Sequence, residues 1–350
     1  MDSQVLNIGV IGCGTIAERM LAAWYPHMRN ARLVAAADVN AARTEVFRSR
    51  FGVEHKYADY RDLLSASDVD AVLVLTPNFL HAEQSIAAAQ AGKHVLCQKP
   101  MAMNLEEARA MIDAADMNGV TLMAAFVKRF WPYYAKVRDL IDQGVLGRIV
   151  SIRTQFSHSG IGKYYKPASD WFLDPAKAGG GPLADLGVHH FDVLRWMAGA
   201  EVTEVTALMS GMDDAGSLED NALVNLRFAN GMLAQGYYSF TTIAPPGVTI
   251  ERLDVFGTNG TVMVNLAHPG RVTVQLSVES GPGSEFGGWI DVPVLEPVPA
   301  FGLMLQHFVD AIQAGQIPVT TGEDGYRSIE ISQAAYLSAR DGERVQLHHG

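Results

Sequence analysis

A glycine-rich turn between an apolar run and a helical pattern constrains this chain more than any other feature. Residues 5–11 are predicted to form a strand and residues 16–24 a helix, and G-C-G-T-I-A occupies positions 12–17 between them. The first glycine permits a tight turn, the second lets a backbone approach a pyrophosphate, and the small sixth residue lets helix and strand pack closely. The helix start adds N–H groups and the positive end of a dipole. The pattern predicts a dinucleotide site formed by Gly12, Gly14, Thr15, Ile16 and Ala17.

Asp38 ends the next predicted strand, residues 33–37. A carboxylate at this position can accept hydrogen bonds from an adenosine ribose and repels a 2′-phosphate, which favours NAD over NADP. Arg43 follows closely in the sequence, and this keeps NADP open as a second cofactor.

Strand and helix patterns alternate through the first third of the chain. Further strands are predicted at residues 71–75, 94–97 and 121–125, and helices at 41–51, 79–91 and 105–118. Such alternation is typical of a doubly wound parallel sheet in an α/β domain. We place this domain at residues 1–126.

Beyond residue 126 the pattern changes to successive strands. Helices are predicted at 131–143, at a segment ending near 198 and at 325–339, and strands at 149–156, 202–209, 221–228, 232–241, 249–256, 261–265 and 272–278. Asn230-Gly231 and Asn259-Gly260 favour tight hairpin turns. We expect residues 127–350 to form an α+β domain with a large, mostly antiparallel open sheet. An apolar open face would be buried by another subunit, so we expect a homodimer or homotetramer.

The amino-acid composition limits the kinds of partner that this protein is expected to bind. Lys and Arg number 27 and Asp and Glu 38, for a net charge of −11, which disfavours nucleic acid. The two cysteines, Cys13 and Cys97, form neither a disulfide framework nor a zinc cluster and are expected to pack as thiols in a reducing compartment. No apolar run approaches the ~20 residues of a membrane span, and the start lacks a secretory leader. We expect a cytoplasmic protein with no membrane partner.

Two further predicted strands end in polar residues. Thr76-Pro77-Asn78 follows one and Gln98-Lys99-Pro100 the other. The carboxyl ends of parallel strands share the edge at which open α/β sheets bind ligands. For Thr76 and Asn78, helix capping is as favoured an interpretation as contact with a ligand. Lys99, considered by itself, would be interpreted as an exposed surface lysine.

The segment 179–192, GGGPLADLGVHHFD, has the highest density of chemically active residues. On a helix, Asp185, His189 and Asp192 lie on one face at spacings of four and three. An imidazole flanked by carboxylates is a sensible acid/base site. The alternatives are an N-cap role for Asp185, a core role for His189 and, less favoured, a metal site formed by all three residues. His190 points elsewhere and is interpreted as structural.

Together these segments resemble the glucose–fructose oxidoreductase and inositol dehydrogenase family (Gfo/Idh/MocA) over nearly the whole chain. Residues 76–102 resemble its second segment with a Lys-Pro pair, residues 179–192 its catalytic segment, and residues 321–347 its C-terminal helix and last strand. The resemblance implies a Rossmann-type first domain and NAD(P)-dependent oxidation of a sugar or cyclitol. Gln98 departs from the family's usual glutamate, which bears on substrate choice.

The resemblance also implies roles for single residues. Lys99, Asp185 and His189 match the family's catalytic residues, with His189 as proton acceptor and Lys99 between nicotinamide and substrate. The expected cofactor contacts beyond the glycine turn and Asp38 are Thr76, Pro77, Asn78, His81, Gln98 and Lys99. Substrate contacts are expected from Lys99, Arg129, Tyr164, Asp185, His189 and Asp192, although an interdomain salt bridge is an equal alternative for Arg129.

Two other functions remain open at this level. Some relatives use a retained NAD to epimerise or cleave sugars without net redox change. Others serve as non-catalytic NAD- or sugar-sensing regulators, but a sensor has no chemical need for Lys99, Asp185 and His189 together. Hydride transfer between nicotinamide and a secondary alcohol is the expected activity.

Overall fold

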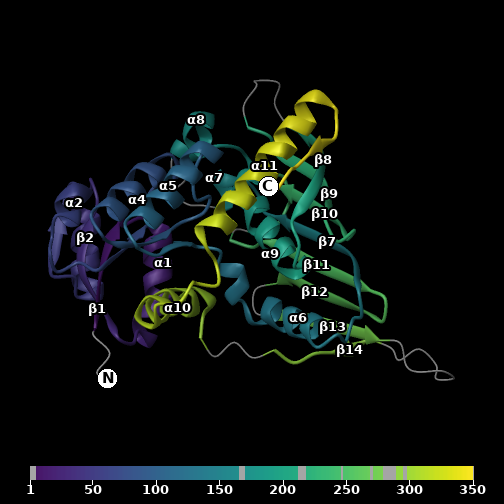
Figure 1. Ribbon diagram of the computed structural model, residues 1–350, viewed down its shortest axis with the longest axis horizontal. Helices are drawn as coiled ribbons and strands as arrows, with labels where there is room; N and C mark the ends of the chain where they lie inside the picture. The colour runs from purple at the N-terminus through teal and green to yellow at the C-terminus, as the bar shows by residue number, and fades with distance from the viewer. Residues whose placement is uncertain are drawn as a thin grey trace. The chain divides into compact units, whose positions relative to one another are not determined.

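The computed structural model describes residues 5–164, 170–211, 218–245, 247–268, 271–278, 289–294 and 298–349. Contacts within the chain divide it into two compact units (Figure 1). The first unit comprises Met1–Phe130 and Glu296–Ile329, and the second comprises Trp131–Leu295 and Glu330–Gly350.

The first unit is built on a parallel sheet. Within the described residues it has six strands in the order β3-β2-β1-β4-β5-β6. Every neighbouring pair is parallel. The strands are β1 (Leu6–Ile11), β2 (Ala31–Ala37), β3 (His55–Tyr57), β4 (Ala71–Val74), β5 (His94–Cys97) and β6 (Leu122–Ala124). This order confirms the doubly wound sheet, and the short β3 is an addition to the predicted strands.

Helices follow the strands of this sheet in turn. They are α1 (Thr15–Trp24), α2 (Ala41–Phe51), α3 (Tyr60–Leu64), α4 (His81–Gln90) and α5 (Leu105–Met117). The side chain of Asn40 caps α2 and that of Asn104 caps α5. The chain moves outward from β1 in both directions, so right-handed crossovers distribute these helices over both faces of the sheet.

Helix α10 (Ala300–Ala314) was not among the predicted elements. It packs on α1, where Gln306 Oε1 accepts a hydrogen bond from Trp24 Nε1 at 3.2 Å and another from the Arg29 N–H at 2.9 Å. These contacts explain why residues 296–329 belong to the first unit. The expected division into 1–126 and 127–350 differs from the observed one in this respect, because a late segment of the chain returns to the first sheet.

The second unit is built on a mostly antiparallel sheet, as expected. Its nine strands in the described residues run in the order β14-β13-β12-β11-β7-β10-β9-β8-β15, and β7 and β10 form a parallel pair. The strands are β7 (Ile149–Ser157), β8 (Val202–Ser210), β9 (Asn221–Phe228), β10 (Leu233–Ser239), β11 (Ile250–Gly257), β12 (Gly260–His268), β13 (Arg271–Val278), β14 (Ile290–Asp291) and β15 (Val345–Gln346).

One face of this sheet is covered by helices. Tyr134 of α6 (Pro132–Asp142), Phe191 of α9 (Val188–Ala198) and Ala335 of α11 (Gly322–Asp341) share a core with strand residues such as Leu226 and Leu253. Two short helices, α7 (Ile161–Tyr164) and α8 (Pro175–Ala178), lie between β7 and α9 in the chain.

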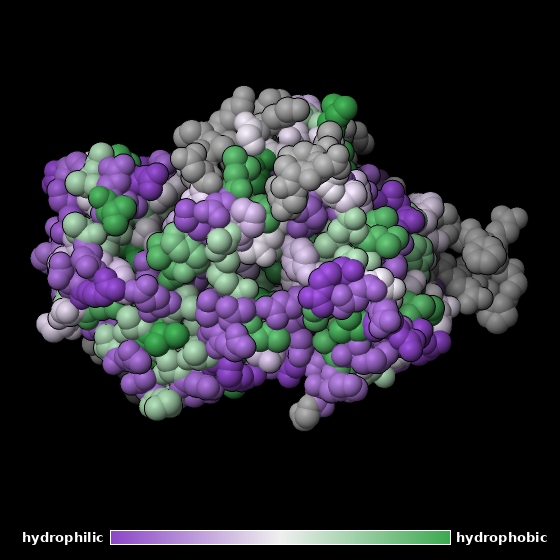
Figure 2. All heavy atoms as spheres, turned by 90° about the horizontal axis from the view of Figure 1, so that it is seen from above, coloured by the Kyte–Doolittle hydropathy of each residue, from purple (hydrophilic) through white to green (hydrophobic). Residues whose placement is uncertain are grey.

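The other face of the sheet is of mixed character. Leu208, Leu223 and Leu233 are 74%, 44% and 45% exposed. In register with Leu233 stand the polar residues Ser151 and Arg227, and Tyr237 stands in register with Leu223. The open face is therefore less apolar than expected. Figure 2 shows the molecule from above, where hydrophilic and hydrophobic residues are intermixed over the surface turned to the viewer.

Candidate active site

Gly12 is required by the fold itself. Its φ is +91°, and a Cβ placed on it would lie 2.8 Å from Thr76 Cγ2 and 2.9 Å from the Leu75 carbonyl. The turn after β1 thus passes close to the end of β4, at the point where the order of the parallel sheet reverses direction. Ligands bind at this switch point in open α/β sheets.

Gly14 differs from Gly12 because no packing requires it. It is the N-cap of α1 and makes no side-chain cap hydrogen bond. A Cβ built on it would have no neighbour within 4 Å outside the helix and the adjacent residues. A helix start with open space before it fits a pyrophosphate, whose oxygens accept from first-turn N–H groups. Ala17 is fully buried, as close packing of helix and strand requires, and Thr15 is exposed.

Asp38 follows β2, and its carboxylate faces the glycine turn. Oδ2 accepts from the Cys13 N–H and Oδ1 from the Asn40 N–H, both at 2.8 Å. The side chain of Asp38 is 6% exposed, and Arg43 Nη1 lies 3.7 Å from Oδ2. The negative charge is held at the edge of the glycine turn, where it fits a ribose diol better than a 2′-phosphate.

The two cysteines are buried thiols. Burial is the main cause that raises the pKa of Cys13 and of Cys97 to about 12. Neither thiol forms the nucleophilic thiolate at neutral pH. Their role is packing, as the sequence indicated.

Polar residues at the ends of β4 and β5 are held by internal contacts. Thr76 Oγ1 donates to Gln84 Oε1 at 2.6 Å, and neither Thr76 nor Asn78 serves as a helix cap. His81 is fully buried, with its ring nitrogens 2.8 Å from the carbonyl oxygens of Thr76 and Pro100. Burial lowers the pKa of His81. Both ring nitrogens of His81 thus face backbone carbonyls that follow two strands, and the cofactor contact expected of His81 stays a prediction.

Gln98 is also used within the first unit. Its Oε1 accepts from the Lys99 N–H at 2.8 Å, its Nε2 lies 3.4 Å from Met20 Sδ, and it is 7% exposed. Lys99 is half-buried. The backbone of Lys99 is thus anchored at the carboxyl edge of the sheet, beside Pro100.

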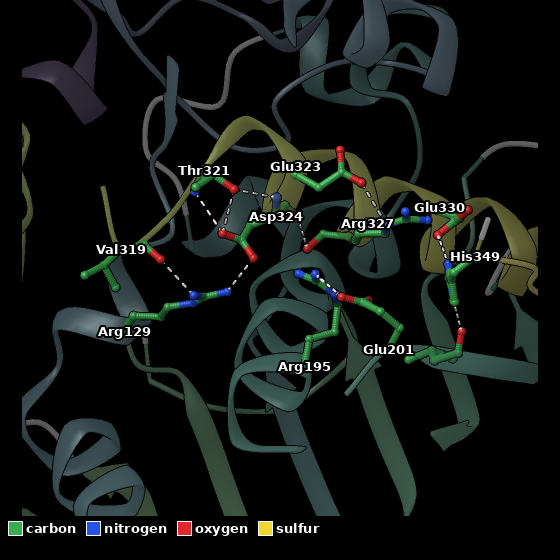
Figure 3. Close-up of polar contacts among 12 residues, drawn as sticks. Arg129, Arg195, Glu201, Val319, Thr321, Glu323, Asp324, Arg327, Glu330 and His349 are labelled. Atoms are coloured by element: carbon green, nitrogen blue, oxygen red, sulfur yellow. Dashed lines mark hydrogen bonds and ion pairs between the residues drawn. The ribbon is translucent and has the colours of Figure 1, made fainter. Parts of the chain in front are cut away.

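Arg129 forms an ion pair inside the first unit. Its Nη2 donates to Asp324 Oδ1 at 2.9 Å and its Nη1 to the Val319 carbonyl at 2.8 Å (Figure 3). The side chain is 8% exposed. The salt bridge considered for Arg129 therefore exists, but its partner belongs to the same unit, since residues 296–329 return to the first sheet.

The catalytic candidates of the second unit lie on an irregular helical segment. Leu183–Gly187 form a π-helical turn that runs directly into α9, in place of the regular helix that the spacing predicted. From Gly181 to His190, every residue is buried except His189, which is half-buried. Asp185 is 6% exposed. Pro182 starts the turn without a side-chain cap, so Asp185 is not its N-cap.

His190 and Asp192 are fully buried. His190 Nε2 lies 3.2 Å from Glu251 Oε1, to which the Tyr134 hydroxyl also donates. This buried network, which the sequence did not indicate, confirms a structural role for His190. Phe156 lies beside both histidines, its ring centroid 6.3 Å from that of His189 and 5.5 Å from that of His190.

The side chain of Tyr164 lies outside the described residues. Among the residues that the structure describes, no group of three His, Cys, Asp or Glu side chains is arranged to hold a metal. In the same part of the chain, the helices fall short of the length and apolar character that crossing a membrane requires.

The fold and the site at its first sheet define a nicotinamide-dependent oxidoreductase. Residues 6–126 match the oxidoreductase family with an NAD-binding Rossmann fold, and residues 134–263 match the GFO/IDH/MocA C-terminal domain. Myo-inositol 2-dehydrogenase of Thermotoga maritima is 32% identical over 98% of both chains. 1,5-Anhydro-D-fructose reductase of Ensifer adhaerens is 31% identical, again over 98% of both.

A solved structure of a sugar dehydrogenase is also similar to this chain. Levoglucosan dehydrogenase in complex with NADH superposes with a TM-score of 0.85 at 27% identity, covering 97% of this chain and 98% of that one. The chain belongs to the Gfo/Idh/MocA family of oxidoreductases. This confirms the resemblance, the Rossmann fold, the enzyme class and the NAD cofactor.

Proposed function

We propose that this enzyme transfers a hydride between NAD and a secondary alcohol of a sugar, a sugar derivative or a cyclitol. The observation that carries the proposal is the half-buried His189, set among buried residues and four positions after Asp185. The named relatives act on inositol, levoglucosan and anhydrofructose, which supports a polyol substrate.

The first unit supplies the residues that would hold NAD. The open space at the Cβ position of Gly14, at the start of α1, suits the pyrophosphate, and Asp38 suits the adenosine ribose. Val39, which the sequence analysis missed, is 94% exposed directly after Asp38 and offers an apolar contact to the adenine ring. Thr76, Pro77, Asn78, His81, Gln98 and Lys99 remain proposed contacts at the carboxyl edge.

In this proposal each catalytic residue has one task. The bound nicotinamide supplies the hydride chemistry. His189 accepts the hydroxyl proton of the substrate as a general base. Lys99 donates to the same oxygen and stabilises its developing negative charge. Asp185 orients His189 or Lys99, and Asp192 stays a proposed substrate-side acid.

His189→Ala tests the assignment of the base. We expect kcat to fall by ~100-fold or more, since general-base catalysis contributes ~10²–10⁴-fold. The Kd of NAD, measured by quenching of protein fluorescence, should change less than about twofold. Unchanged turnover would remove His189 from the mechanism.

The substrate itself is found by a panel assay. Purified protein is mixed with NAD or NADP and with inositol isomers, aldoses, sugar acids and anhydrosugars, and the reduced-nicotinamide absorbance is followed. We expect a rate with NAD and at least one polyol. NAD binding without a rate on any compound would contradict the proposed hydride transfer from polyols to NAD.

We also propose that the enzyme is a cytoplasmic homodimer or homotetramer assembled through the open face of the second sheet. Leu208, Leu223 and Leu233 on that face support the interface, and the buried thiols Cys13 and Cys97 suit a reducing compartment.

A further inference from the structure

Glycines 179–181 precede the π-helical turn. At two of them, contacts within the second unit leave no room for a side chain. A Cβ on Gly180 would lie 2.0 Å from the Tyr336 hydroxyl, and a Cβ on Gly181 would lie 2.0 Å from the Glu219 carbonyl oxygen. Glu219 and Tyr336 therefore approach the backbone of these two glycines so closely that a side chain there would clash. Neither residue was indicated by the sequence.

The Glu219 carboxylate receives three hydrogen bonds. The N–H of Gly181 donates to Oε2 at 3.0 Å, the N–H of Leu183 donates to Oε1 at 3.0 Å, and the Tyr336 hydroxyl donates to Oε1 at 2.8 Å. Tyr336 lies on α11, and Glu219 lies two residues before β9 begins at Asn221, so the carboxylate is linked to both the sheet and a long helix. Burial raises the pKa of Glu219, and its three donors oppose this shift.

The contact reaches Asp185 through one residue, Gly181. Gly181 donates its N–H to Glu219, and its carbonyl accepts from the Asp185 N–H at 3.0 Å. Leu183, the other backbone donor, begins the π-helical turn that carries Asp185 and leads to His189. A negative charge at the start of this helical stretch also complements the helix dipole.

We propose that Glu219 is a positioning residue: its carboxylate, held by Tyr336, fixes the start of the π-helical turn and thereby the placement of Asp185 and His189. The inference rests on the proposed function of these two residues. An amide cannot replace the carboxylate. Whichever way a glutamine is turned, its NH₂ group faces the N–H of Gly181 or of Leu183, and one buried donor loses its acceptor.

The test compares E219Q with E201Q. Glu201 accepts two hydrogen bonds of 2.7 Å from Arg195, near the far end of α9 (Figure 3). E201Q therefore weakens the same helix without touching the π-helical turn. We expect E219Q to lower kcat ~10–100-fold, as misplacement of catalytic groups by ~1 Å does. The Kd of NAD should stay within about twofold in both variants, and kcat of E201Q within about twofold of the parent.

Tyr336→Phe adds a milder variant that keeps both backbone contacts of Glu219. We expect a ~3–10-fold loss of kcat, and no further loss when it is combined with E219Q, because Tyr336 acts through the carboxylate. If E219Q fails to fold, the Y336F variant by itself tests the positioning role of Glu219. A kcat of Y336F equal to that of the parent overturns the proposal. Equal losses in E219Q and E201Q also overturn it.

Hydrogen–deuterium exchange of the peptide spanning 179–187 separates this inference from the proposed function. We expect slow exchange in the parent, faster exchange in E219Q and parental exchange in E201Q. A parent that turns over no polyol refutes the proposed function, while this exchange pattern would still support the positioning role of Glu219. Unchanged exchange in E219Q refutes that positioning role even if the enzyme is active.

Discussion

The Asp38 carboxylate, directly after β2, binds the glycine turn through Oδ2 and the N-cap residue of α2, Asn40, through Oδ1. One charged side chain therefore does two things. It holds the Cys13 backbone in the turn, and it presents negative charge where a 2′-phosphate of NADP would lie. Arg43, 53% exposed and 3.7 Å away, is the cation closest to this carboxylate among its described contacts.

Asp38→Asn should shift the cofactor preference toward NADP. The amide keeps one acceptor for a backbone N–H, but it removes the repulsion and leaves Arg43 to attract the phosphate. We expect the ratio of kcat/KM for NAD to that for NADP to fall ~10–100-fold, since hydrogen bonds to charged groups contribute ~1.5–3 kcal/mol. Arg43→Ala is the control and should not favour NADP. An unchanged ratio in the Asn variant would show that other groups select the cofactor.

At the scale of elements, α10 shows how a segment late in the chain can complete an early domain. Its central Gln306 is 6% exposed and binds Trp24 and Arg29, which lie at the end of α1 and just beyond it. Signals for this helix exist in the sequence: Pro299 precedes it and Gly315 ends it with φ +62°. Its packing partner, in contrast, is more than 270 residues away, as the separation of 277 between Gln306 and Arg29 shows.

Gln306→Ala should destabilise the first unit. The substitution leaves the buried indole N–H of Trp24 without its acceptor, at a cost of about 1–3 kcal/mol in the free energy of unfolding. Gln313→Ala is the matched control on the same helix, because Gln313 donates to the Asn30 carbonyl in an exposed position. Its cost should stay below about 0.5 kcal/mol. Urea unfolding followed by tryptophan fluorescence measures both, and equal costs would contradict the role of Gln306.

At the scale of the whole molecule, the chain forms two units that are not simple halves of the sequence. The division falls within α11, between Ile329 and Glu330. The open face of the second sheet carries three exposed leucines among charged and polar neighbours. A mixed face of this kind suits an interface between subunits, which commonly combines apolar and polar contacts.

Sedimentation at micromolar concentration tests the proposed assembly. We expect a dimer or tetramer for the parent and a smaller species for Leu208→Glu, since a buried unpaired charge opposes association. Leu173→Glu is the control: Leu173 is also exposed, at 63%, but lies on a short helical turn outside the sheet. A monomeric parent would refute the assembly.

Local patterns in the sequence determined much of this protein. The apolar runs and glycine turns predict most of the strands and helices, although not α10 or β3, and the order of these elements predicts a parallel first sheet and a largely antiparallel second one. Gly12 and Gly14 were predictable because both act within one strand–turn–helix unit, and Asp38 was predictable because it directly follows a predicted strand. The family was readable from three ordered motifs.

Which residues hold the site residues in place was determined only by the tertiary structure. Glu219 and Tyr336 meet glycines 180 and 181, and His81 meets Pro100, through contacts between segments that no local pattern relates. The π-helical turn replaced the regular helix that the spacing of Asp185 and His189 predicted. The physical reason is the same in each case: a buried polar group must find its partner in space, and sequence periodicity reports only which side of an element is buried.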